Sequence, residues 1–297
     1  MTVVLALLAS LFIGVSDFLG GMASRTRSPL EASVVLQIAA LLTLIPIAAC
    51  LGASDLTVHD AGLGAVSGLA TSVAYVGFFT AIDRGRMSIV VPISAAVTAM
   101  LPAIVGIVDG NELSTIALGG VLCALVAIPL VAYQSDDRES VNGGEAARSR
   151  EADRGSEDGW PATRQVLVSI LCGGGFGLYF VCIGHTHRSA GLWPAVANLA
   201  VAVAVTVPIA VRGGVMPTFP HASRVAAGGG VALGVADTGL TVALQRGPLT
   251  IASVLGNLYP LVTIALGVAV LKERIRPWHA AGIILAVAGV AMIAAGQ

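Results

Sequence analysis

Apolar residues fill most of the chain in long uninterrupted runs, and polar residues gather in the segments between them. The runs reach or approach the ~20 residues that an α-helix needs to cross the hydrocarbon core of a bilayer. They are continuous, whereas the strands of a membrane β-barrel alternate apolar and polar residues over about ten positions. The pattern therefore predicts ten transmembrane helices, at residues 3–22, 30–51, 62–82, 87–108, 113–133, 165–184, 190–211, 223–245, 248–271 and 277–296.

The two halves of the chain resemble each other. Ala81-Ile82-Asp83-Arg84-Gly85 aligns with Ala243-Leu244-Gln245-Arg246-Gly247, and Pro46-Ile47-Ala48 aligns with Pro208-Ile209-Ala210. Each half holds five predicted helices, an odd number, so the second copy must enter the membrane from the opposite side. The predicted fold is an all-α integral membrane protein of ten transmembrane helices, arranged as two inverted five-helix repeats. Many secondary transporters have this architecture, with the substrate site near the bilayer midplane at the repeat interface.

A charged segment separates the two copies. Residues 134–164 are dense in Asp, Glu and Arg and include Gly143-Gly144. A segment this polar cannot bury enough apolar surface to fold, so we expect a solvated, disordered linker. The expected domains are a first repeat at 1–133, the linker at 134–164 and a second repeat at 165–297.

Composition agrees with a membrane protein. The chain is 56% hydrophobic and 11% charged, with a mean hydropathy of +0.89, whereas soluble domains are about 25% charged. The net charge of −1 gives no global field that would attract nucleic acid, and the lipid bilayer is the expected partner. The four cysteines lie within apolar runs without CxxC spacing, which is typical of small core residues and not of a disulfide or metal set.

The basic residues are distributed unevenly between the two faces of the predicted bundle. We call the face that bears the N-terminus side A and the opposite face side B. Of the 16 Lys and Arg residues, only Arg188 and Arg246 fall on side A. The positive-inside rule then places side B in the cytoplasm and both termini outside.

A set of turn and helix motifs recurs in the two halves, with a short Arg-Gly turn, a proline-containing helix, a glutamate after it and a glycine-rich last helix. In the first half these are Arg84-Gly85, Pro92, Pro102, Glu112 and Gly119-Gly120; in the second they are Arg246-Gly247, Pro260, Leu271-Lys272-Glu273-Arg274, Gly282 and Gly289. With these motifs the chain resembles the drug/metabolite transporter superfamily, in particular its EamA-type ten-helix branch. The resemblance implies export or exchange of small metabolites, such as amino acids or drugs, across a bacterial inner membrane. It also implies cytoplasmic termini, which contradicts the charge distribution.

Two carboxylates at bilayer depth are the sharpest candidates for function. Asp17 lies eight residues before Arg25 and Asp237 nine before Arg246, which places both near the midplane and within about 5 Å of each other in depth. A charge at the helix centre costs roughly 2.5–3.5 kcal/mol on insertion scales. Neither is duplicated, because Asp17 aligns with Leu178 and Asp237 with Tyr75. We expect them to bind a cationic substrate group or a coupling proton; the alternative is a carboxyl group satisfied across a helix interface.

A weaker set of uncharged polar residues lies within the predicted helices. Each could line a central cavity with a polar tip on an apolar body, or could make a cross-helix hydrogen bond instead. These candidates for substrate or proton binding are Gln37, Tyr75, Tyr179, Asn198, Asn257 and Tyr259. The third, fourth, eighth and ninth predicted helices should line the cavity, with the first, second, sixth and seventh contributing. The fifth and tenth should pack at a repeat or homodimer interface.

Other chemistry is disfavoured by the sequence. His185 and His187 have the spacing of a metal pair, but no neighbouring residue completes a site, so we expect a solvated loop without metal or cofactor. No nucleophile triad or nucleotide-binding loop is found. The predicted function is a secondary transporter, not an enzyme, that exports a small-molecule substrate by alternating access coupled to protons. The alternatives are uptake or exchange, and an intramembrane enzyme that acts on lipid-linked substrates.

Overall fold

The protein is described by a computed structural model that covers residues 1–24, 29–53, 55–84, 87–110, 113–132, 160–215, 221–271 and 277–296. This part of the chain is helical throughout and contains no strand. Its elements are α1 (Thr2–Ser24), α2 (Pro29–Leu51), α3 (Val58–Arg84), α4 (Met87–Val108), α5 (Thr115–Ala132), α7 (Ala162–Gly184), the short 3-10 turn η2 (Arg188–Ala190), α8 (Trp193–Arg212), α9 (His221–Arg246), α10 (Leu249–Gly256), α11 (Tyr259–Leu271) and α12 (Pro277–Ala295).

Helix lengths and composition confirm an all-helical, multi-pass membrane protein. Within the described residues, seven helical stretches are long and apolar enough to cross a bilayer, and three further apolar stretches are shorter, at Ile93–Val108, Thr115–Ile128 and Ala280–Ile293. The predicted helices differ from the observed ones by a few residues at their ends, with one exception described next. Most of the predicted linker, and the motif residues Gly85, Glu112 and Lys272-Glu273-Arg274, lie outside the described residues.

The helix predicted at residues 248–271 is broken. α10 ends at Gly256, a turn at Asn257 and Leu258 follows, and α11 begins at Tyr259. Pro260 is the second residue of α11, where its missing N–H and fixed φ are compatible with the first turn of a helix. The break leaves the backbone groups of two helix ends in the interior of the protein, a feature that many transporters place at their substrate sites.

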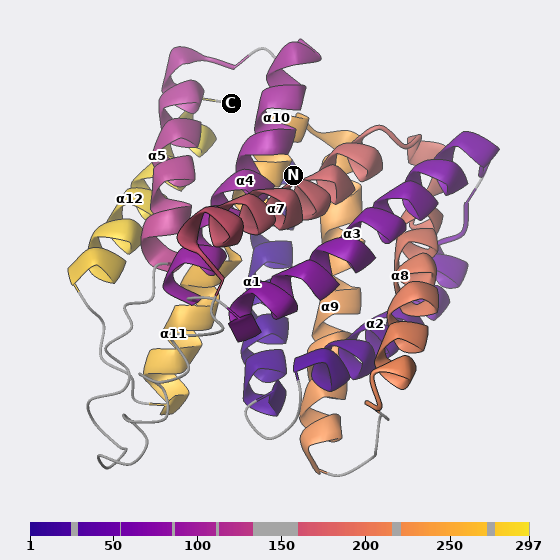
Figure 1. Ribbon diagram of the computed structural model, residues 1–297. Helices are drawn as coiled ribbons and strands as arrows, with labels where there is room; N and C mark the ends of the chain where they lie inside the picture. Colours follow the sequence, from indigo (N-terminus) through magenta and orange to yellow (C-terminus); the bar gives the residue numbers. More distant parts are fainter. Residues whose placement is uncertain are drawn as a thin grey trace, which may run out of the picture.

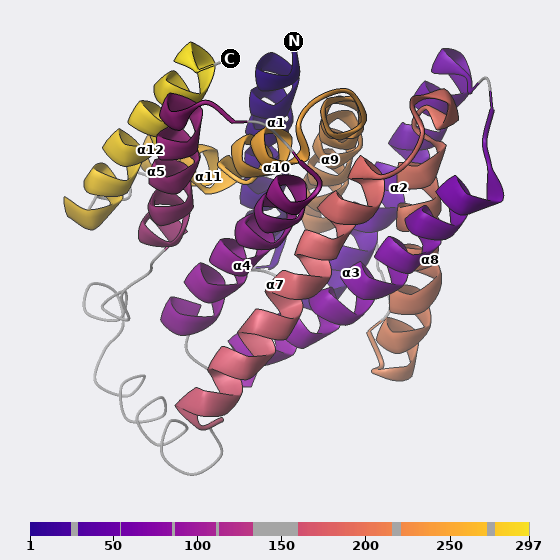
Figure 2. The same ribbon diagram turned by 90° about the horizontal axis from the view of Figure 1, so that it is seen from above.

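Helices from the two halves of the chain pack on each other more extensively than on their own sequence neighbours. α1 and α2 lie along α9, α3 lies along α7 and α8, and α4 lies along α7. Figures 1 and 2 show α5 beside α12 at one end of the bundle and α2 beside α8 at the other, with α1 and α9 between them. The fifth and tenth predicted helices therefore pack against each other.

Glycines permit these close helix contacts. A Cβ atom at Gly120 would lie 2.6 Å from the carbonyl oxygen of Gly289, and one at Gly289 would lie 2.8 Å from that of Gly120, so the backbones of α5 and α12 touch there. Gly234 of α9 approaches Ala40 and Thr43 of α2 in the same way. Small residues at such positions are the usual basis of helix association in membranes, where no hydrophobic force drives helices together.

The largest buried core occupies the half of the bundle nearest side A. It includes Ala6 and Ala9 near the start of α1, Ile183 near the end of α7 and Leu244 near the end of α9. All eight residues of α10 are buried as well. By contrast, Val262 and Ala265 of α11 keep partial or full exposure, while Leu261 packs against this core. The bundle is thus packed tightly towards side A, and the break between α10 and α11 marks the border of this core.

Candidate functional site

A carboxylate and a phenol from two helices of the second half of the chain meet in the interior. The Tyr179 hydroxyl of α7 donates a hydrogen bond of 3.1 Å to Oδ1 of Asp237 on α9. Asp237 is 6% exposed and Tyr179 is 9% exposed. The ring of Tyr179 packs edge-to-face on Phe180, with ring centroids 5.6 Å apart, which holds the hydroxyl toward the carboxylate.

Asp17 lies on the opposite side of the helix break. Its helix α1 touches α11 at Gly14, where a Cβ atom would lie 2.8 Å from the carbonyl oxygen of Tyr259. The Thr263 hydroxyl donates to the carbonyl oxygen of Gly14 at 3.3 Å, which fixes the same contact. The Asp17 side chain itself is exposed.

Three tyrosines lie within electrostatic range of one or both carboxylates. The Asp17 charge acts on the hydroxyls of Tyr75 and Tyr259, and the Asp237 charge acts on those of Tyr75 and Tyr179. Tyr75 on α3 is thus within electrostatic range of both carboxylates, and its ring is held edge-to-face against Phe176 at 4.9 Å. We call Asp17, Tyr75, Tyr179, Asp237 and Tyr259 the polar cluster. It brings together five of the eight predicted site residues.

The register of α1 on α9 separates Asp17 from Asp237 further than the sequence spacing predicts. Gly229 of α9 contacts Ser16 and Leu19 of α1, while Gly239 lies level with Leu5 and Ala9. Asp17 is therefore level with Gly229, eight residues from Asp237, which is about 12 Å along the helix axis. This axial separation exceeds the difference in depth of about 5 Å that was predicted by counting from loop residues, a count that takes no account of how the two helices pack. The polar cluster is an elongated track.

Asn257 occupies the helix break between α10 and α11. Its Nδ2 donates to the carbonyl oxygen of Ser253 at 2.9 Å. Its Oδ1 atom is buried and has no hydrogen-bond partner in the described part of the chain. Buried polar atoms are nearly always paired, so an open acceptor at a broken helix is a candidate contact for a bound ligand or a second conformation.

Gln37 and Asn198 lie away from the polar cluster, in contacts between helices. The Thr206 hydroxyl of α8 donates to Oε1 of Gln37 at 3.0 Å, and Gln37 donates to Ser33. Asn198 donates to the Ser67 hydroxyl of α3 at 2.9 Å. Both amides are almost fully buried. These bonds tie α8 to α2 and to α3, and they match the cross-helix alternative for these two residues.

The helices that carry the polar cluster are only partly those predicted to line the cavity. The cluster draws on α1, α3, α7, α9 and α11, whereas the fourth predicted helix was expected among the main contributors and the first and sixth only in support. α4 instead packs along α7, where Ser94 and Thr98 donate to the carbonyl oxygens of Ser169 and Gly173. Its role in this arrangement is to hold the helix that carries Tyr179.

The pattern of the EamA-like transporter family matches residues 1–133 and 157–295, nearly the whole chain in two segments. The chain belongs to the EamA-like transporter family. This family is part of the drug/metabolite transporter superfamily, so the protein is a membrane transporter of that type. No curated protein matches this EamA-like transporter. A solved structure titled "Crystal structure of protein" shares 15% sequence identity with a TM-score of 0.75, covering 97% of this chain and 94% of the other, and shows the same fold.

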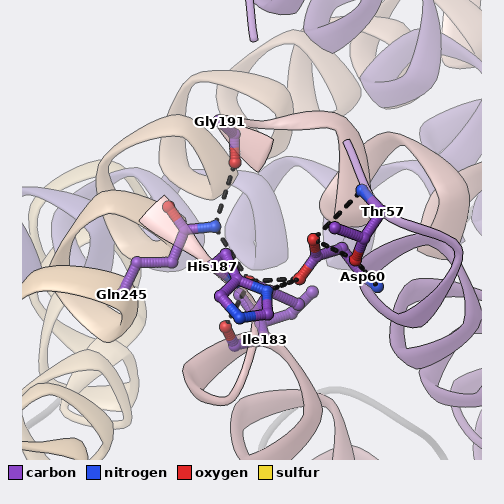
Figure 3. A network of polar contacts seen from close by, with 7 residues as sticks. Thr57, Asp60, Ile183, His187, Gly191 and Gln245 are labelled. Atoms are coloured by element: carbon purple, nitrogen blue, oxygen red, sulfur yellow. Dashed lines mark hydrogen bonds and ion pairs between the residues drawn. The ribbon is translucent and has the colours of Figure 1, made fainter. Parts of the chain in front are cut away.

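Side A of this EamA-like transporter carries a second polar network, which joins loops of the two halves (Figure 3). Asp60, near the start of α3, accepts hydrogen bonds from the Thr57 hydroxyl at 2.7 Å and from the backbone N–H of His187 at 2.8 Å. The Thr57 N–H donates to Oδ2 of Asp60 and the Thr57 hydroxyl accepts from the Asp60 N–H, the reciprocal pattern of a helix capping box. His187 Nδ1 also lies 3.0 Å from Oδ1 of Asp60. Sequence reasoning missed this site, because Asp60 is 127 residues away from His187.

Further contacts close the same face of the transporter. Gln245, at the end of α9, donates to the Thr186 hydroxyl and to the carbonyl oxygen of Gly191. Arg188 donates to the carbonyl oxygen of Gln245 at 3.1 Å. Gly191 has a φ of +56° and lies against the carbonyl oxygen of Gly52, a backbone conformation and a close approach that both favour glycine. The α2–α3 and α7–α8 loops are therefore locked together over the side A end of the bundle.

Proposed function

We propose that this EamA-like transporter is a secondary active exporter of small metabolites, amino-acid-like or drug-like, that works by alternating access with proton coupling in a bacterial inner membrane. The proposal includes ten transmembrane helices in two inverted repeats, with α10 and α11 as halves of one span. Reciprocal packing supports the repeats, since α1 lies on α9 as α7 lies on α3, and α2 lies on α9 as α8 lies on α3.

The observation that carries the proposal is the hydrogen bond between Tyr179 and Asp237 inside the bundle. A carboxylate that is 6% exposed and has no basic partner in the described part of the chain is expensive to keep charged in a membrane. Such a group gains stability by binding a proton or a cationic group of a substrate. Because the Tyr179 hydroxyl donates to it, the site can hold the charged form for part of the cycle.

The two carboxylates have different access, which suits a transport cycle. Asp17 is exposed, whereas Asp237 is buried beside the core that packs toward side A. We propose that this conformation is closed to side A and that ligands reach the polar cluster from side B, past Asp17. Opening the opposite way would require the contacts of Gln245, Arg188 and Asp60 across side A to break.

The ligand chemistry follows from the polar cluster. Either carboxylate can recognise a cation, such as an ammonium group, while tyrosine rings contact apolar parts of a substrate and their hydroxyls exchange hydrogen bonds with its polar groups. The open Oδ1 acceptor of Asn257 would take a hydrogen from a donor on the same ligand. An amphipathic amine or amino acid fits this combination best.

The experiment that tests the proposal compares metabolites in the medium of cells that express the wild type, Asp17→Asn, Asp237→Asn or the matched control Asp109→Asn, at equal membrane levels. Asp109 is an exposed carboxylate on side A that pairs with His185 at 3.1 Å, so its substitution makes the same chemical change outside the polar cluster. We expect one compound to accumulate with the wild type and Asp109→Asn, and at least tenfold less of it with the other two variants. Identical profiles for all variants and for cells without the protein would refute the export proposal.

A further inference from the structure

Three metal-binding side chains meet on side A, outside the polar cluster. One ligand atom from each of His59, Asp60 and His187 lies within 4.8 Å of the other two. We propose that these residues form a binding site for a divalent transition-metal ion such as Zn²⁺, which bridges the two loops that close side A. The site is independent of the transported substrate and of the polar cluster.

The distances are close to those that one ion would require. Nδ1 of His187 lies 3.0 Å from Oδ1 of Asp60, and two ligand atoms on one tetrahedral Zn²⁺ ion are about 3.3 Å apart when each is about 2.0 Å from the metal. His59 faces His187 across a centroid distance of 6.0 Å. Its side chain is exposed, so a rotamer change can bring the imidazole onto the shared ion without disturbing the core.

The carboxylate at the centre of the site is held in place before any ion binds. Asp60 is fully buried. Its Oδ2 atom accepts from the Thr57 hydroxyl and N–H, and its Oδ1 atom accepts from the His187 N–H. Hydrogen bonds of this kind orient metal ligands and raise affinity in known metal sites. Only the His187 ring would have to exchange its hydrogen bond with Asp60 for a bond to the ion.

The donor set indicates the class of ion. Two imidazoles and one carboxylate are preferred by Zn²⁺ and its transition-metal neighbours, whereas Mg²⁺ and Ca²⁺ prefer a shell of oxygen atoms. Three protein ligands leave the fourth position to water, and both histidines are exposed toward the aqueous phase on side A. An ion in this position would join the α2–α3 turn of the first half to the α7–α8 loop of the second, and would hold side A closed.

The test is a titration of the full-length protein in detergent with Zn²⁺, followed by calorimetry and by metal analysis after gel filtration. The variants are His59→Ala and His187→Ala. Two matched controls are His185→Ala, which removes an exposed imidazole from the same loop, and Cys50→Ser, which removes an exposed thiol that could bind zinc elsewhere. We expect one Zn²⁺ per chain in the wild type and both controls, and affinity at least about tenfold weaker in the two histidine variants.

Hydrogen exchange supplies an independent readout of the bridge. Addition of Zn²⁺ should slow exchange at residues 55–60 and 185–191 in the wild type and in His185→Ala, and should have no effect in His59→Ala. The proposal is overturned if the wild type binds no stoichiometric Zn²⁺, if His59→Ala and His187→Ala bind it as tightly as the controls do, or if neither loop gains protection. In each of these outcomes the Asp60–His187 contact is a hydrogen bond that closes side A without metal.

Discussion

Two adjacent glycines in α7 should respond in opposite ways to the same substitution. A Cβ atom at Gly173 would lie 2.6 Å from the carbonyl oxygen of Ser94 and 2.8 Å from Cβ of Val97, both on α4, whereas one at Gly174 would have no atom within 4 Å. Carbon atoms pack best at about 3.5–4.0 Å. Gly173→Ala must therefore push α7 and α4 apart by roughly 1 Å, while Gly174→Ala needs no movement.

The expected energies follow from the contacts that change. Overpacking of this kind costs about 1–3 kcal/mol. Separation of the helices also stretches the bonds from Ser94 to Ser169 and from Thr98 to Gly173, each worth about 0.6 kcal/mol between membrane helices. Gly173→Ala should lower the free energy of unfolding by about 2–4 kcal/mol. Gly174→Ala should leave it unchanged or raise it by up to about 1 kcal/mol, the helix preference of alanine over glycine.

The assay is unfolding of the purified variants by increasing mole fractions of SDS, with transport measured in parallel. Because Tyr179 lies six residues after Gly173 on the same helix, displacement of α7 should also move its hydroxyl from Asp237 and reduce transport. The two substitutions alter composition identically, so Gly174→Ala controls for any general effect of alanine. Unfolding free energies that agree within about 0.5 kcal/mol would refute the inferred contact between α7 and α4.

Three further predictions concern the polar cluster, the helix contacts and the topology. Tyr179→Phe keeps the ring but removes the hydroxyl that donates to Asp237; substrate efflux should fall at least tenfold while the thermal midpoint of the purified protein stays near that of the wild type, and full efflux would contradict a role for this bond. Thr206→Val removes the donor to Gln37 and should lower the free energy of unfolding in SDS by about 0.6–1.7 kcal/mol, with efflux retained. Loss of efflux at unchanged stability would indicate instead that Gln37 takes part in substrate binding. Alkaline phosphatase fused to the C-terminus should be active if side A is extracytoplasmic. Fluorescence from a green-fluorescent-protein fusion at the same position would show the opposite orientation.

Helix positions could be predicted from sequence because each span must satisfy its backbone within the bilayer, so apolar length alone identifies it. The break between α10 and α11 could not be predicted from proline alone. Pro46 and Pro208 lie inside continuous helices, while Pro260 follows a break. The signal that was available is the order Gly256-Asn257 before Pro260, in which two residues that favour helix ends precede one that favours a helix start.

The candidate site was accessible from sequence only in part. Asp17 and Asp237 stand out because charges inside apolar runs are costly, and this argument needs no three-dimensional information. Which uncharged residues accompany them depends on helix register, since a polar side chain in a span faces either the cavity or a neighbouring helix. Tyr179 donates to Asp237, and Tyr75 and Tyr259 lie within electrostatic range of the carboxylates. Gln37 instead accepts from α8, and Asn198 on α8 donates to α3. The Asp60–His187 contact could be found only in the folded structure, because the two residues are 127 positions apart in the sequence.

In the proposed two-repeat arrangement, the two halves contribute different residues to the polar cluster. In the alignment of the two halves, Asp237 falls opposite Tyr75 and Asp17 opposite Leu178, next to Tyr179. These paired positions supply three of the five members of the cluster and the direct neighbour of a fourth, so each half contributes residues to the same track. Their chemistry has diverged, and one carboxylate lies exposed while the other is buried beside the side A core. We propose that this divergence lets the occupied carboxylate differ between the two facing states of the transport cycle.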